Sequence, residues 1–257
     1  MVSTYPQVAV REFDQGQHSL LKSIGLHLLP GLLTAAFYLL ISKPIMSHGY
    51  PPMFAMLIAV IFITVPLELS ELLRTGRAPD WRISLKGIVP YLKPVSAWQY
   101  VAFPIGFLAL ALLASGAAGV IDAATVRVWS QWLPSWFFMQ DIGQYAGYTR
   151  NVLMITLIVN LVLNGIVAPV IEELYFRGYL LPRLSRFGIL SPLISSVLFT
   201  VYHFWQLYAY ASIFLVMTPL IYLVWRKQNI YLGIAAHCAL NIIGNLMLFG
   251  AILSKSQ

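Results

Sequence analysis

A few polar residues interrupt the apolar runs in the C-terminal half of this chain. Glu172 and Glu173 end one long apolar run, His203 lies within the next, and His237 and Asn241 lie within the last. Polar and ionisable groups are costly inside apolar helices, so each of these residues needs a partner or a function. We therefore begin with the chemistry that these five side chains could perform together.

Helical spacing assigns these residues to faces. Glu173 and Arg177 are four positions apart, so they share a face and can form an ion pair. Glu172 points roughly 100° away from that pair and remains free for another task. His237 and Asn241 are also four apart and should project side by side.

This combination of groups is typical of a hydrolytic site. A carboxylate such as Glu172 can act as a general base toward water, and a neighbouring imidazole can orient that water or carry its proton. A second histidine with an asparagine on a facing helix can supply donors to a developing oxyanion. Cys238 adjoins His237 but points away from it, so a thiol nucleophile is not favoured, and no Gly-x-Ser-x-Gly sequence is present.

Two alternatives remain open at this point. Glu172, His203 and His237 could form a three-ligand zinc set with an open fourth position, although no His-Glu-x-x-His sequence supports a metal, and we predict a metal-free site. The same residues could also form a buried network that only fixes helix packing, in a scaffold or a small proton-coupled transporter. The two halves of the chain show no inverted repeat, which argues against common transporter designs.

The elements that position these groups are membrane helices. Of the 257 residues, 59% are hydrophobic and 10% charged, and mean hydropathy is +0.77. Soluble domains carry roughly 25% charged residues. The runs are too long for barrel strands, so we predict one all-α polytopic bundle over residues 1–257, in contact with membrane lipid and not with nucleic acid. The predicted spans are Ile24–Ile41, Met53–Leu69, Val101–Ile121, Val152–Ile171, Ile189–Trp205, Tyr208–Trp225 and Ile230–Leu253, and the last could be two helices, giving seven or eight.

The loops predict an orientation. Most of the 16 Lys and Arg residues fall on the same side as the N-terminus, so we expect the N-terminus to be cytoplasmic. Two aromatic connectors, Asp80–Trp98 and Trp129–Phe138, are expected to anchor at the headgroups, with substrate guidance as the alternative. His27, Glu68 and Glu71 sit at span ends and are expected to reach the headgroups as well.

One geometric problem accompanies the shared site. If the spans were simple cylinders, Glu172 and His203 would lie near opposite membrane surfaces. They can meet only if the fourth helix continues well past Glu172 or breaks near Gly165 and Pro169. We therefore predict a long or kinked helix there, with the site in a water-filled cavity.

The three motifs occur in a known order. Glu172-Glu173-x-x-x-Arg177, Phe199-x-x-x-His203 and His237-x-x-x-Asn241 resemble the motifs of the CAAX protease and bacteriocin-processing family, also called the Abi family. That family includes the Ras-converting CAAX endopeptidase. The resemblance covers Ala168–Asn245, the predicted catalytic helices, and the N-terminal half is similar only in hydropathy.

The resemblance implies a glutamate-dependent intramembrane endopeptidase. By motif position, Glu172 would be the base and His203 would position the water. His237 and Asn241 would stabilise the oxyanion, and Glu173 with Arg177 would support the site. Substrates would be membrane-associated or lipidated proteins or peptides, of the CAAX type or in bacteriocin and peptide processing. Family members have also been described as metalloproteases, so zinc stays an alternative, and oligomeric state is not predicted.

Overall fold

The computed structural model describes residues 16–76, 85 and 87–255, and over these residues the fold is all-helical. One isolated bridge pairs Leu92 with Asn229. Six helical runs are long and apolar enough to cross a bilayer, which makes the chain an integral multi-pass membrane protein. These runs are Leu20–Ser47, Pro52–Thr75, Gln99–Trp129, Arg150–Tyr202, Phe204–Lys227 and Ile230–Lys255.

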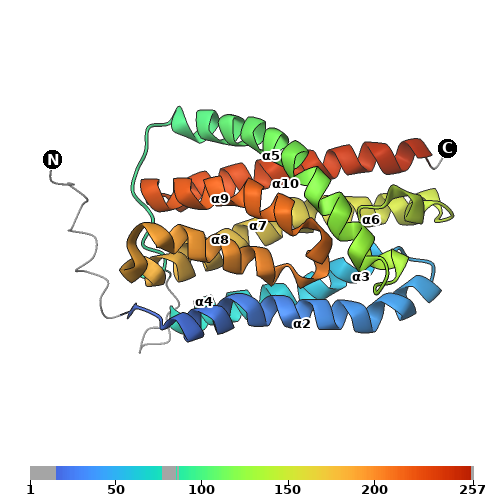
Figure 1. The fold of residues 1–257 in the computed structure, drawn as a ribbon, viewed down its shortest axis with the longest axis horizontal. Helices are drawn as coiled ribbons and strands as arrows, with labels where there is room; N and C mark the ends of the chain where they lie inside the picture. Colours follow the sequence, from blue (N-terminus) through green and yellow to red (C-terminus); the bar gives the residue numbers. More distant parts are fainter. Residues whose placement is uncertain (1–15, 77–84, 86, 256–257) are drawn as a thin grey trace.

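The first two runs lie along one side of the bundle, and the third starts on the opposite side (Figure 1). Helix α2 (Leu20–Ser47) packs beside a returning helix made of α3 (Pro52–Ala59), the π-helical segment η2 (Val60–Thr64) and α4 (Val65–Thr75). Helix α5 (Gln99–Trp129) crosses the bundle obliquely and contacts the last two helices. These helices surround the elements that carry the candidate site.

The fourth run is continuous in helical assignment but bends back on itself. Its 53 residues would extend about 80 Å as a straight α-helix, far beyond a hydrocarbon core of about 30 Å. The chain reverses near Gly188, whose φ of 55° suits glycine. The segments are α6 (Arg150–Val162), η5 (Leu163–Val167), α7 (Ala168–Glu172), η6 (Glu173–Leu180), η7 (Leu181–Leu190) and α8 (Ser191–Tyr202).

The predicted continuation past Glu172 is present. Segments η5 and η6 are π-helical, so the helix widens on both sides of α7, and helical turns continue to Leu190. Gly165 lies in η5 and Pro169 in the first turn of α7, where a missing N–H is tolerated. Glu172 is therefore in the interior of a helical run and not at its end.

Helix α8 is too short to span a bilayer. Its 12 residues extend about 18 Å, and the chain then turns through η8 (Phe204–Ala209) into α9 (Tyr210–Lys227). Asp122 of α5 stabilises this turn, because its carboxylate accepts from the backbone N–H groups of Ala211 (3.1 Å) and Ser212 (3.2 Å) and from the Ser212 hydroxyl. The two legs α8 and α9 pack against each other as a hairpin.

The count of spans differs from the prediction. The predicted spans Val152–Ile171 and Ile189–Trp205 lie within a single run, so six candidate spans are found and seven or eight are not confirmed. The last run, which could have been two helices, is the single helix α10 (Ile230–Lys255). The glycines within it do not interrupt its backbone hydrogen bonding.

Two residues assigned to the headgroups are instead buried. His27 and Glu68 are fully buried inside the bundle, and Glu71 is only partly exposed. Hydropathy located these residues along their helices but did not report which face they occupy. Of the 16 basic residues used for orientation, four lie outside the described residues: Arg11, Arg77, Arg82 and Lys86.

The aromatic connector Trp129–Phe138 does more than lie at the membrane surface. Trp132 is exposed, but Phe137 and Phe138 are buried and pack against Tyr208 of η8. The connector thus covers the turn between α8 and α9. The other connector, Asp80–Trp98, falls partly outside the described residues, and its described part is buried at Val89 and Tyr91 and exposed at Trp98.

Candidate active site

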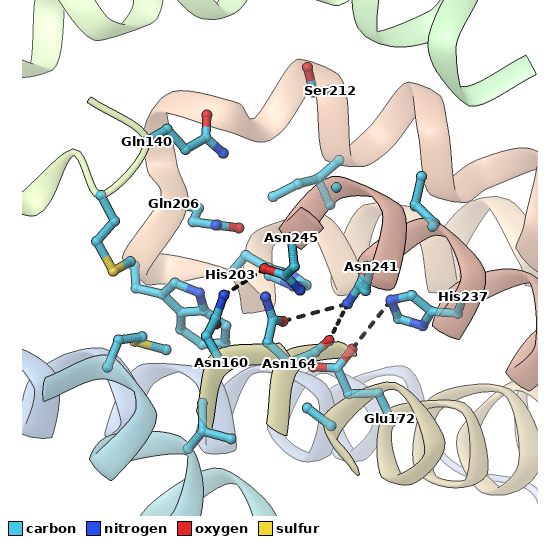
Figure 2. A pocket seen from close by; sticks show the side chains of 18 of the residues that line it. Gln140, Asn160, Asn164, Glu172, His203, Gln206, Ser212, His237, Asn241 and Asn245 are labelled. Carbon is cyan, nitrogen blue, oxygen red and sulfur yellow. Dashed lines mark hydrogen bonds and ion pairs between the residues drawn. The ribbon is translucent and has the colours of Figure 1, made fainter. Parts of the chain in front are cut away.

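A cavity of about 550 Å³ lies among the C-terminal helices, with α3 on one side. Four residues singled out by sequence, Glu172, His203, His237 and Asn241, all line it. They come from α7, the end of α8, and α10, and Figure 2 shows them around a common space. The fold therefore brings together residues that are up to 69 positions apart in the chain.

Glu172 and His237 are the closest pair across the cavity. The Oε2 atom of Glu172 lies 4.0 Å from Nε2 of His237, and both side chains are largely buried (Figure 2). This separation exceeds a direct hydrogen bond but allows one water molecule to contact both atoms. A carboxylate and an imidazole in this relation can hold and polarise a water.

Glu173 fixes the orientation of His237. Its Oε1 atom lies 3.0 Å from Nδ1 of His237 and 3.3 Å from Nη1 of Arg177. Because a carboxylate oxygen accepts, Nδ1 carries the proton in this contact and Nε2 is directed to the cavity. Sequence spacing predicted the Glu173–Arg177 pair, but the contact with His237 came only from the structure.

The Glu173 carboxylate occupies a tightly fitted space. Gly233 of α10 makes room for it, since a Cβ atom there would lie 2.5 Å from Oε2 of Glu173 and 2.8 Å from Val224. Arg177 is fully buried, and its guanidinium carbon lies 3.9 Å from the centre of the Phe199 ring. The phenylalanine of the second motif thus provides a cation–π contact to the arginine of the first.

His203 lies at the turn where α8 ends. Its Nδ1 donates to the carbonyl oxygen of Phe199 at 2.8 Å, so in the neutral ring Nε2 is an acceptor. Aromatic contacts with Phe199, Tyr202 and Trp205 hold the ring at centroid distances of 4.8 to 5.0 Å. His203 reaches Glu172 only across the cavity that both line.

Asparagines connect α10 to the widened fourth helix. The Nδ2 atom of Asn241 donates to the backbone oxygen of Asn164 at 2.8 Å, and Nδ2 of Asn160 donates to Oδ1 of Asn245 at 2.6 Å (Figure 2). Asn164 lies in the π-helical segment η5, where a backbone carbonyl can lose its regular helical partner. The same nitrogen also makes a longer contact, of 3.5 Å, with Oδ1 of Asn164, so Asn164 receives both contacts of the Asn241 amide.

Two of the three candidate zinc ligands approach each other, since Oε2 of Glu172 lies 4.0 Å from Nε2 of His237. Among the described residues, no three His, Cys, Asp or Glu side chains converge as a metal-binding group. The metal-free site stays a prediction, with zinc as its alternative.

A further acidic side chain near the cavity was missed from sequence. Glu68 of α4 is fully buried and accepts a hydrogen bond from the hydroxyl of Tyr202, a cavity-lining residue, at 2.8 Å. Glu68 and Leu72 are the buried residues of α4 and are four positions apart. Their shared face was the available signal that Glu68 points inward.

Comparison with known proteins agrees with the motifs. The sequence model of the family described as "Type II CAAX prenyl endopeptidase Rce1-like" matches residues 154–243, which are 90 of the 257 residues and contain all three motifs. No curated protein and no solved structure gives a significant match. The match confirms the resemblance to the CAAX protease family and supports a CAAX-type intramembrane protease.

Proposed function

We propose, from the family match over residues 154–243, that this chain is an intramembrane endopeptidase in which Glu172 activates a water molecule. The observation that carries the proposal is the 4.0 Å approach of Glu172 Oε2 to His237 Nε2 at a cavity, with Glu173 holding the other ring nitrogen. The substrate would be a membrane-associated or lipidated protein or peptide, and the name of the matching family favours a prenylated C-terminal segment.

The proposed reaction is a direct attack of water on a peptide bond. Glu172 takes a proton from the water, and the water oxygen bonds to the carbonyl carbon, whose oxygen becomes an oxyanion. The proton on Glu172 then passes to the nitrogen of the leaving amine as the carbon–nitrogen bond breaks. A carboxylate and an amine are the products, and no covalent enzyme intermediate is required.

The hydrogen bonds of the site limit what each imidazole does. Nε2 of His203 can accept a hydrogen bond from the attacking water, because Nδ1 already donates to Phe199. Nε2 of His237 can donate to an oxyanion only when the ring is an imidazolium, because Nδ1 faces Glu173. Asn241 is the second donor in this proposal, and its Nδ2 would give up the longer contact with Oδ1 of Asn164 to bind the oxyanion.

The site would lie closer to the cytoplasmic membrane surface. His237 is seven positions after the start of α10, about 10 Å along the helix from the end of the bundle that also carries residue 20 of α2 (Figure 1). The Lys and Arg distribution supports a cytoplasmic location for that end. The fourth run turns back near Gly188, and α8 is its second leg. Counting its two legs separately gives seven apolar segments. Helix α8 and the following α9 form the hairpin that presents His203.

A comparison of membrane peptides tests this function and identifies the substrate. Membranes containing the wild-type protein or Glu172→Ala at equal levels are incubated with a prenylated C-terminal peptide and its unprenylated counterpart, and products are identified by mass spectrometry. We expect cleavage of the prenylated peptide by the wild-type protein only. Equal product formation with Glu172→Ala would contradict the proposal and favour a scaffold whose polar network is not catalytic.

A further inference from the structure

Glu68 lies outside the three motifs but inside the same part of the bundle. It is fully buried in α4, its Oε1 accepts from Tyr202 at 2.8 Å, and its Oε2 has no hydrogen-bond partner among the described residues. A buried carboxylate in a membrane helix is expensive, and such residues commonly serve a function.

The position of α4 connects Glu68 to Glu172. Helix α4 packs against α7 and η6, the segments that carry Glu172, Glu173 and Arg177. Glu68 lies within electrostatic range of both Glu172 and Arg177. Two acidic side chains therefore share one apolar region with a single guanidinium that already pairs with Glu173.

The partner of Glu68 is the last residue of α8. Tyr202 is fully buried, and its ring lies 4.9 Å from the His203 ring and 4.8 Å from Phe176. Its backbone carbonyl sits directly against Gly31 of α2, where a Cβ atom would collide with it. The end of α8 is thus held between α2 and α4, one residue before His203.

We propose that Glu68 is a positioning residue of the site, which anchors Tyr202 next to His203 through the hydrogen bond that joins α4 to the end of α8. The inference rests on the proposed function, because it assigns Glu68 a role in that reaction. The hydrogen bond fixes the turn that directs His203 into the cavity.

Two variants test the hydrogen bond. Glu68→Gln keeps an acceptor for Tyr202, whereas Tyr202→Phe removes the hydrogen bond and leaves Glu68 in place. Glu71→Gln is the matched control, since Glu71 lies on the same helix but pairs with Arg74 and accepts from Tyr179, neither of which lines the cavity. Each protein is assayed in vesicles for kcat and KM across pH with the prenylated peptide.

The expected results differ between the variants. Glu68→Gln should keep kcat near the wild-type value, because its amide oxygen can accept the hydrogen bond from Tyr202. Tyr202→Phe should lower kcat roughly 10-fold or more with little change in KM, because small displacements of catalytic groups are costly. Glu71→Gln should match the wild-type protein in both respects.

The inference and the proposed function fail in different ways. If the wild-type protein cleaves and Glu172→Ala does not, but Tyr202→Phe has the wild-type kcat, the role of Glu68 is overturned and the protease remains. Should Tyr202→Phe fail to fold, Glu68→Ala decides, because it also removes the hydrogen bond, and an unchanged kcat overturns the role. If the wild-type protein cleaves no peptide, both proposals are overturned.

Discussion

Gly233→Ala should disable the site without touching any proposed catalytic residue. The added Cβ would lie 2.5 Å from Oε2 of Glu173 and 2.8 Å from Val224. Ordinary contact requires Glu173 to move by about 1 Å, but its other oxygen is held by His237 at 3.0 Å and Arg177 at 3.3 Å. Because Glu173 holds His237, a displacement of about 1 Å is passed to that imidazole and costs about 100-fold in rate.

The same substitution should lower stability moderately. Overpacking in a filled interior destabilises by about 1–3 kcal/mol, which a folded membrane protein can tolerate. Gly244→Ala is the control, because it lies on the same helix and its Cβ would meet nothing within 4 Å. Peptide cleavage in vesicles gives kcat, and thermal unfolding in detergent gives stability. Wild-type kcat in a folded Gly233→Ala protein would refute the claim that Glu173 must stay in place.

Two further predictions concern the metal and the hairpin. Removal of divalent metals with EDTA or 1,10-phenanthroline should leave cleavage unchanged, since the described donors do not form a three-ligand set. Loss of activity that Zn²⁺ restores would contradict the metal-free site. Asp122→Ala should lower the free energy of unfolding by about 1–2 kcal/mol, because it removes the carboxylate that caps α9. Asp141 caps only a short 3₁₀ turn, so Asp141→Ala should have a smaller effect in the same thermal unfolding assay.

The sequence predicted the helical class well, because long apolar runs without strand-like alternation determine it. All-helical architecture and the continuation of the fourth helix beyond Glu172 are confirmed. The number of spans was not confirmed, because hydropathy cannot distinguish the 12-residue α8 from a full crossing. A short helix that ends in a turn gives the same apolar signal as one that crosses.

Residue contacts between helices were less accessible than contacts within one helix. The Glu173–Arg177 pair follows from a spacing of four, and it is present. The contact of Glu173 with His237 joins two helices far apart in sequence, so spacing does not encode it. Glu68 was wrongly assigned to the headgroups because position along a span was used in place of helix face.

The central claim is that Glu172 activates the water that cleaves the peptide bond. Its most direct test is the kcat of Glu172→Gln, a variant of nearly equal size that cannot take a proton, measured beside Glu71→Gln in the same vesicles. We predict a fall of at least about 100-fold for Glu172→Gln, in line with the loss of a general base, and wild-type kcat for Glu71→Gln. A folded Glu172→Gln protein that cleaves at the wild-type rate would contradict the account.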